Sequence, residues 1–222
     1  MTIKGLYIRT FGTIISAVLF LTACSRQMGG FTTAELDIIN GSDSIMRVLT
    51  IENETDLKVL RASCSDLSYE MLTSPAYDKL AELMVTTVTH PSQDGVGIAG
   101  PQVGINRRIV AVQRFDKEIV QPDGSITNPF EVYPNIRIIW QSDSLALGPE
   151  GCLSVPDRRG DVLRSQEIVI EYADNNAIRN GATRNRATDD IPTVRDTVRG
   201  FTAVIFQHEI DHLDGILYID RI

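Results

Sequence analysis

Apolar and polar positions alternate along this chain with two different periods. A helical period predicts a helix over Pro75–Val88, with one apolar stripe formed by Tyr77, Leu80, Met84 and Val88. Alternation and β-branched side chains predict strands in three segments: Arg108–Gln113, the Glu131–Trp140 region and Glu167–Tyr172. Helices and strands in this order favour an α+β fold with antiparallel or mixed β-sheets.

Another helix is predicted near the C-terminus, over Phe201–Leu213. Its first half, Phe201–Phe206, is apolar enough to be buried, and Gly215 suits a C-terminal cap. Its second half is polar and holds two of the three histidines of the chain. A buried helix with this composition needs a polar partner in the folded protein.

The two histidines of this helix, His208 and His212, are four residues apart, with Glu209 beside the first. Residues at i and i+4 project from one helix face, so both imidazoles can bind one metal ion while Glu209 reaches the water that the ion activates. A chance histidine pair on an amphipathic helix is the alternative. The pattern favours metal-assisted hydrolysis.

A catalytic ion usually takes a third protein ligand. The remaining histidine, His90, stands in a polar loop, whereas Cys152 stands in Glu150-Gly151-Cys152-Leu153-Ser154-Val155-Pro156. Glycine before the thiol permits close approach of the backbone, and the proline stiffens the chain after it. We therefore expect Cys152 to complete a Cys/His/His site.

A glycine-rich run, GVGIAGPQVG, covers Gly95–Gly104. It lacks the Gly-Lys-Ser/Thr ending of a phosphate loop, and a strand rather than a helix is expected after it, so a dinucleotide site is disfavoured. We interpret the run as a tight backbone segment that lines a site.

In this order, GVGIAGPQ, EGCLS and QHEIDHLDG resemble the three motifs of the peptide deformylase family, and similarity extends from about Val48 to Ile222. The chain departs from the family at Gly100, where a second alanine is usual, which predicts a slightly looser loop. The polar stretch Asp174–Thr197 is also longer than in compact relatives. The resemblance implies sheets wrapped around a central C-terminal helix that bears the HExxH motif.

The resemblance also implies the roles of individual residues. Cys152, His208 and His212 would bind the metal, and Glu209 would be the general acid/base. The oxyanion that forms when water attacks the formyl carbonyl of the substrate would be stabilised by the side-chain amide of Gln102 and the backbone N–H of Leu153. The methionine pocket and the peptide path would be formed by Val96, Gly97, Gly151, Arg159, Phe201, Val204 and Ile205.

The expected reaction is removal of the formyl group from N-formylmethionyl peptides, with release of formate. One thiolate and two imidazoles suit a borderline-soft divalent ion, and the resemblance favours Fe²⁺ over Zn²⁺, Ni²⁺ or Co²⁺. Two other functions stay open on the sequence alone: a metallopeptidase of the cell envelope, and a non-catalytic lipoprotein that binds peptides.

The N-terminus resembles a bacterial lipoprotein signal peptide. Lys4 and Arg9 precede an apolar stretch, Phe11–Leu21, that is too short for an ordinary membrane-spanning helix, and Leu21-Thr22-Ala23-Cys24 resembles a lipobox. We expect residues 1–23 to be the signal peptide, Cys24 to be lipidated, residues 24–45 to be a tether and residues 46–222 to be the catalytic domain. The protein would be a membrane-anchored lipoprotein of the cell envelope, or cytoplasmic if this N-terminus is not processed.

Composition narrows the range of partners. The formal net charge is −8, which argues against nucleic-acid binding through bulk charge. Three cysteines do not make a disulfide framework, so Cys64 is interpreted as a small buried residue rather than a partner of Cys152. We expect one domain and a monomer.

Overall fold

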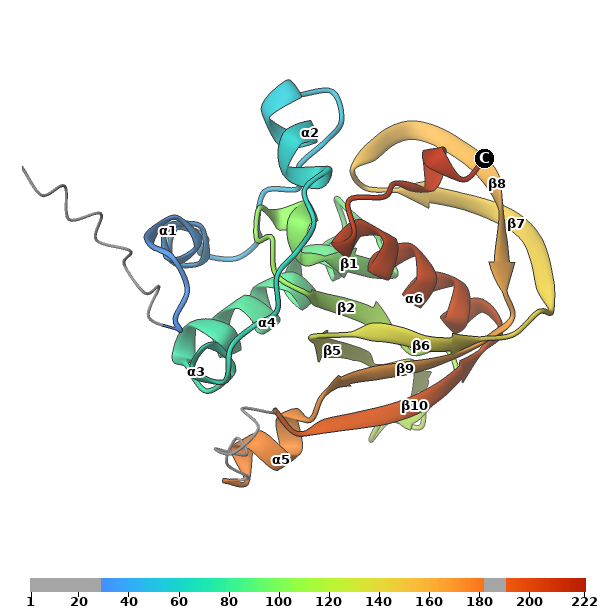
Figure 1. The fold of residues 1–222 in the computed structure, drawn as a ribbon. Coiled ribbons are helices and arrows are strands. Elements are labelled where there is room, and N and C mark those ends of the chain that lie inside the picture. Colours follow the sequence, from blue (N-terminus) through green and yellow to red (C-terminus); the bar gives the residue numbers. More distant parts are fainter. Residues whose placement is uncertain (1–28, 182–190) are drawn as a thin grey trace, which may run out of the picture.

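The structure is a computed structural model that describes residues 29–181 and 191–222 (Figure 1). The predicted signal peptide and Cys24 lie outside these residues. Within them, no helix is both long and apolar enough to cross a membrane. The helices are α1 (Thr33–Gly41), α2 (Glu54–Leu60), α3 (Tyr69–Leu72), α4 (Pro75–Thr89), α5 (Asn175–Arg179) and α6 (Gly200–Leu213), with short 3-10 helices at Gly100–Val103 and Tyr218–Asp220.

The strands form four small sheets, and all of their pairings are antiparallel. The first two sheets are β1 (Gly97–Ala99), β2 (Ile109–Gln113) and β5 (Phe130–Pro134), and β10 (Thr193–Arg199), β9 (Glu167–Ala173) and β6 (Arg137–Gln141). The two hairpins are β3 (Ile119–Val120) with β4 (Ile126–Thr127), and β7 (Leu145–Cys152) with β8 (Val155–Ser165).

The sheet β1–β2–β5 lies between two helices. In β2, Ile109 and Ala111 pack in the cluster that contains the buried face of α4, whereas Val110 and Val112 pack in the cluster that contains α6. Successive side chains of a strand point to opposite faces, so β2 is buried on both sides and its sequence is a continuous apolar run. This packing fixes the position of α6 relative to the rest of the domain.

Helix α4 confirms the predicted apolar stripe. Ser74 caps its N-terminus by accepting a hydrogen bond from the Tyr77 N–H, and Pro75 occupies the first turn, where its missing N–H has no cost. The four predicted stripe residues are all buried.

The strands predicted in the Glu131–Trp140 region are present, and they are two strands joined by a turn. The chain turns at Asn135, whose φ is 54°, and its side-chain amide bonds the backbone N–H and carbonyl of Leu67. Strand β5 before the turn pairs with β2, and strand β6 after it pairs with β9. A single asparagine in the left-handed region therefore moves the chain from one sheet to the other.

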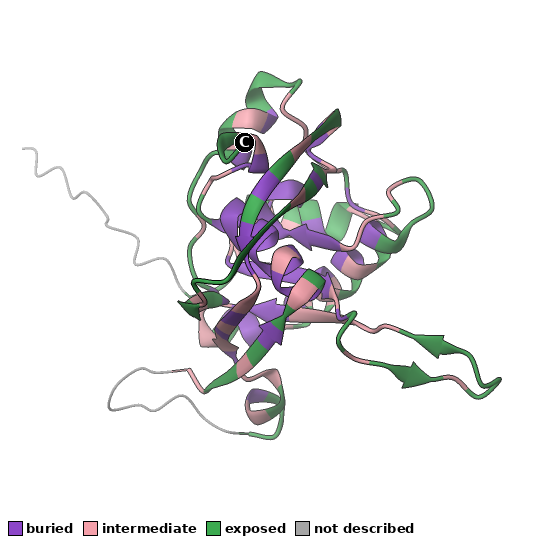
Figure 2. Ribbon diagram, turned by 90° about the vertical axis from the view of Figure 1, so that its right-hand side faces the viewer, coloured by how far each residue is buried: buried purple, intermediate pink, exposed green. Residues whose placement is uncertain are grey.

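Helix α6 lies at the centre, surrounded by the β1–β2–β5 sheet, the β10–β9–β6 sheet and the long β7–β8 hairpin (Figure 1). Eleven residues of α6 are buried. Figure 2 shows that buried residues gather in the middle of the domain and that exposed residues surround them. Gly215, two residues after the helix, has a φ of 73° and confirms the predicted cap. The predicted α+β fold with a central C-terminal helix is confirmed.

Part of the predicted tether is folded. Helix α1 falls within residues 24–45, and a capping box between Thr32 and Glu35 begins it. Its Ile39 is fully buried in the cluster that contains α4. Helix α1 therefore packs on the domain through Ile39. The polar composition of this segment did not indicate that contact.

Candidate active site

Helix α6 brings the predicted histidines together. His208 and His212 lie on the same face with ring centroids 5.1 Å apart, and both are nearly inaccessible to solvent. Two imidazoles at this separation are available to one ion.

The thiol of Cys152 completes the group. Cys152 ends β7 at the tight turn into β8, and its Sγ lies 3.2 Å from Nε2 of His212. One donor atom from each of Cys152, His208 and His212 lies within 4.8 Å of the other two. Bonds of about 2.0 to 2.3 Å to nitrogen and sulfur fit such a group, so these three residues form the predicted metal site.

Glu209 lies beside this site and is 4% exposed. Its Oε2 is buried and has no hydrogen-bond partner in the part of the chain that the structure describes, and neither has Nδ1 of His212. Burial raises the pKa of Glu209 to about 7, although the nearby His208 opposes the rise. A carboxyl group with this pKa can both accept and return a proton near neutral pH.

Gly97 of β1 leaves the room that Glu209 occupies. A Cβ at this glycine would lie 2.5 Å from Oε1 of Glu209 and 2.9 Å from its Cδ. The backbone of β1 therefore packs directly against the carboxylate, a role that the sequence pattern did not show.

The two predicted oxyanion donors lie next to the metal ligands. Oε1 of Gln102 accepts a hydrogen bond from the backbone N–H of Ala99, which turns its Nε2 toward Ser154 Oγ at 3.2 Å and Cys152 Sγ at 3.5 Å. Leu153 stands in the turn between β7 and β8 and lines the cleft. Both groups lie at the same end of the site as the thiol.

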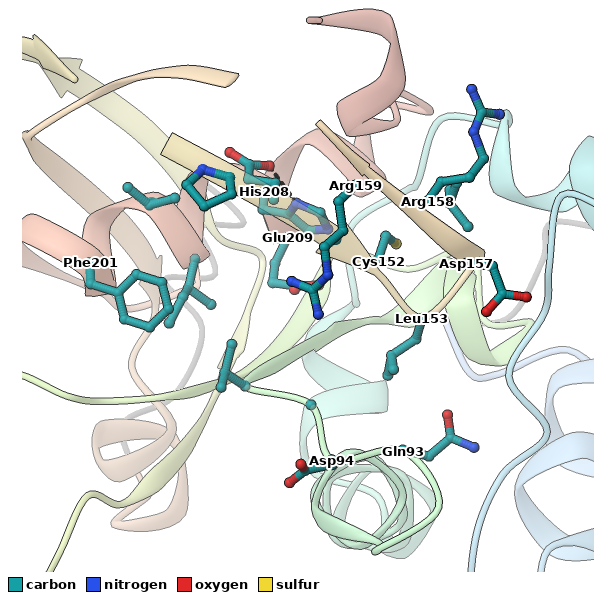
Figure 3. A pocket seen from close by; sticks show the side chains of 18 residues that line it. Gln93, Asp94, Cys152, Leu153, Asp157, Arg158, Arg159, Phe201, His208 and Glu209 are labelled. Atoms are coloured by element: carbon teal, nitrogen blue, oxygen red, sulfur yellow. Dashed lines mark hydrogen bonds and ion pairs between the residues drawn. The ribbon is translucent and has the colours of Figure 1, made fainter. Parts of the chain in front are cut away.

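A cleft of about 770 Å³ is lined by Cys152, Leu153, His208 and Glu209 (Figure 3), whereas Gln102 and His212 lie behind its surface. Of the residues predicted to contact the peptide, six line it: Val96, Gly151, Arg159, Phe201, Val204 and Ile205. Gly97 lies behind Glu209 instead of on the cleft wall. The side chain of Arg159 projects toward the middle of the cleft, whereas that of Arg158 points away (Figure 3).

The part of the chain that contains this site matches a known protein family. The family model described as Polypeptide deformylase matches residues 45–222. A peptide deformylase of Roseiflexus sp. (strain RS-1) is 37% identical over 186 residues, which cover 81% of this chain and 89% of that protein. The chain belongs to the peptide deformylase family. It is therefore an enzyme with peptide deformylase activity and a Cys/His/His metal site, and the family implies formylated peptides as its substrates.

Solved deformylase structures agree with this fold. A class I type b peptide deformylase from Acinetobacter baumannii with bound Met-Ala-Ser has a TM-score of 0.63 and 31% identity, covering 80% of this chain and 98% of that one. The peptide deformylase from Thermotoga maritima has a TM-score of 0.61 and 27% identity, covering 81% and 99%. The family match also disfavours the two rival functions, a metallopeptidase and a non-catalytic peptide binder.

Gly100, which stands where the deformylase motif usually has alanine, does not loosen the loop, contrary to the expectation from the sequence. A Cβ at Gly100 would lie 2.6 Å from the carbonyl oxygen of Ile105 and 2.8 Å from that of Arg107. The backbone after Gly100 has closed onto it, so this loop is tight. The two cysteines of the described domain, Cys64 and Cys152, are both free, so no bridge between them competes with metal binding.

The sequence pattern did not reveal the partner of His208. Nδ1 of His208 lies 2.7 Å from Oε2 of Glu150, which leaves Nε2 to face the metal site. The Arg164 guanidinium donates two hydrogen bonds to Glu150, at 2.8 and 3.0 Å, and one to Asp211 at 2.6 Å. Burial alone would raise the pKa of Glu150. The hydrogen bonds from His208 and Arg164 outweigh this effect and hold the pKa at about 2. The signal in the sequence was the position of Glu150 two residues before Cys152, in the same strand.

Replacing Glu150 with glutamine is expected to weaken metal binding by about 10- to 100-fold, because the carboxylate fixes the tautomer and orientation of His208. The dissociation constant for Zn²⁺, measured by competition with a chelator, tests this. Glu171→Gln is the matched control, since Glu171 pairs with Arg195 at the surface of β9. Equal affinities in the two variants would contradict the role of Glu150.

Proposed function

We propose that this deformylase removes the formyl group from N-formylmethionyl peptides by attack of water on the formyl carbon. One observation carries the proposal: Glu209, buried and without a hydrogen-bond partner at Oε2 among the described residues, lies beside the Cys/His/His donor group on the wall of a partly apolar cleft. This is the arrangement needed for proton transfer at a water molecule held next to the substrate.

Cys152, His208 and His212 would hold a divalent ion, which would supply the Lewis acidity that lowers the pKa of water and polarises a carbonyl oxygen. Glu209 accepts the proton of the attacking water and later delivers one to the departing amine. Its raised pKa suits both steps, because neither protonation state is strongly disfavoured near neutral pH. One thiolate and two imidazoles suit Fe²⁺, Zn²⁺, Ni²⁺ or Co²⁺, and the resemblance to deformylases favours Fe²⁺ as the native ion.

In this proposal two donors stabilise the charge that develops on the formyl oxygen. They are the Nε2–H of Gln102 and the backbone N–H of Leu153. A preorganised donor of this kind contributes about 3 to 4 kcal/mol of transition-state stabilisation. The hydrogen bond from Ala99 to Oε1 of Gln102 supports the assignment, because it orients the amide with its N–H groups toward the thiol.

The methionine side chain would occupy the apolar end of the cleft, formed by Val96, Phe201, Val204 and Ile205. The rest of the peptide would extend past the Gly151 backbone toward Arg159, whose guanidinium projects into the opening. Gly97 packs against Glu209 and would keep this carboxylate in position.

Formate release from formyl-Met-Ala-Ser tests the proposal. The protein is purified without oxygen and loaded in turn with Fe²⁺, Zn²⁺, Ni²⁺ and Co²⁺, and formate and metal content are measured together. Turnover is expected with each bound ion and to be fastest with Fe²⁺. Full metal occupancy with no formate from this peptide would overturn the assigned substrate.

We also propose that Cys24 carries lipid and that the enzyme acts at the cell envelope as a monomer. The support is the sequence of the N-terminus alone: two positive charges, an apolar stretch and Leu21-Thr22-Ala23-Cys24. Labelled fatty acid is expected in the membrane-bound protein and not in Cys24→Ala. Full-length, unlabelled chain in the cytosolic fraction would contradict the proposal and place the enzyme in the cytoplasm.

A further inference from the structure

Two exposed aromatic rings meet at the apolar end of the cleft. Phe201, in the first turn of α6, lines the cleft and is 56% exposed, and Phe115, in the loop after β2, is 39% exposed. Their ring centroids are 5.2 Å apart and their planes are inclined by 54°. Figure 3 shows Phe201 at one end of the cleft wall. Phe115 is outside the family motifs, and the proposed function gives it no role.

A buried arginine holds the loop that carries Phe115. Arg114 is 1% exposed, and its guanidinium donates hydrogen bonds to Asp116 at 2.7 and 2.8 Å and to Asp196 of β10 at 2.9 Å. It also donates to the hydroxyl of Tyr133 in β5, at 2.6 Å. The residues on both sides of Phe115 are therefore fixed by one charged, hydrogen-bonded group.

The same group reaches the helix that carries Phe201. Asp196, which accepts a hydrogen bond from Arg114, lies in β10, and this strand runs directly into α6. Arg114 also lies over the ring of Phe206, 5.7 Å from its centroid, on the buried face of α6. Arg114 thus links the loop that carries Phe115 to both β10 and α6, which places the rings of Phe115 and Phe201 next to each other.

We propose that Phe115 is a positioning residue for methionine selection: it holds the ring of Phe201 against the apolar end of the cleft. This inference rests on the proposed function of the cleft. A more than half-exposed ring in the first turn of a helix has few contacts to fix its rotamer, and Phe115 supplies them. A fixed aromatic wall favours a long, polarizable thioether side chain, because sulfur makes favourable contacts with aromatic rings.

Steady-state kinetics with formyl-Met-Ala-Ser and formyl-Ala-Ala-Ser test the inference. Phe115→Ala is expected to raise KM for the methionine peptide by about fivefold, the effect of losing one aromatic pair, with kcat nearly unchanged. The alanine peptide does not reach the ring, so its KM should stay the same. Phe115→Tyr keeps the ring and should restore the wild-type KM.

A double-mutant cycle separates positioning from a general effect on the loop. In a Phe201→Ala background, Phe115→Ala should have no further effect, because the ring that it holds is gone. Val120→Ala is the matched control, since Val120 is 70% exposed in the β3–β4 hairpin that comes after the same loop. Melting temperature and metal content should match the wild type in every variant.

Three results would overturn the inference alone while the wild-type enzyme stays active. They are an unchanged KM in Phe115→Ala, an equal rise for both peptides, and additive effects of the two phenylalanine substitutions. A metal-loaded wild-type enzyme that releases no formate from either peptide would overturn the proposed function as well as this inference.

Discussion

Glu209→Gln is expected to lower kcat/KM for formyl-Met-Ala-Ser by about 10²- to 10⁴-fold, the usual contribution of a general acid/base. Glutamine has nearly the same shape but cannot accept the proton of the attacking water. The carboxylate is not one of the three clustered donor residues, so the variant should still bind one metal ion. Formate release and metal content, measured on the same sample, check both expectations.

The control for this variant is Glu82→Gln on the exposed side of α4. It makes the same chemical change on an exposed side chain that does not line the cleft and should have wild-type kinetics. A fully metal-loaded Glu209→Gln enzyme with kcat/KM within about threefold of the wild type would exclude Glu209 as the general acid/base, because so small a loss is below the range for such a group.

Gly97→Ala is expected to lower kcat by about 10²-fold, the cost of displacing a reacting group by about 1 Å. The added Cβ would lie 2.5 Å from Oε1 of Glu209 and 2.9 Å from its Cγ and Cδ, so the whole end of the side chain must move. The three heavy atoms nearest to this Cβ all belong to Glu209 and none to a metal ligand, so metal affinity should be retained. Stopped-flow or steady-state formate release measures kcat, and chelator competition measures the affinity.

Gly148→Ala is the matched control, because a Cβ at Gly148 of β7 meets nothing within 4 Å. Both variants add one methyl group to a strand, and only one of them adds it next to Glu209. Wild-type kcat in Gly97→Ala would show that β1 does not position the Glu209 carboxylate. Its position would then be set by α6 alone.

The two buried glutamates of the site have opposite electrostatic environments. Burial raises the pKa of Glu209 to about 7, and no cation forms an ion pair with it in the described residues. Glu150 is also buried, but the hydrogen bonds from His208 and Arg164 keep its pKa at about 2. Two carboxyl groups whose environments push their pKa values apart in this way have different chemical tasks. Glu150 stays ionised and orients a metal ligand, and Glu209 is free to exchange a proton.

The core of the site could be predicted because its signals are local. His208 and His212 share a helix face by their spacing alone, and Cys152 stands in a short motif whose glycine and proline mark a tight turn. The helix Pro75–Val88 was predicted for the same reason, since periodicity within one element does not depend on the rest of the fold. Contacts between elements are different: the turn at Asn135 and the packing of α1 on α4 depend on the whole fold and are not encoded by local spacing.

The sequence by itself thus determined the fold class and the metal ligands, and it placed Glu209 beside them, because each depends on spacing within a helix or a turn. Only the tertiary structure decided which residues support them. Glu150 contacts His208 across 58 positions, and Phe115 meets Phe201 from a different element. Such pairs are set by how sheets and helices pack, and no local pattern of apolar and polar residues encodes that packing.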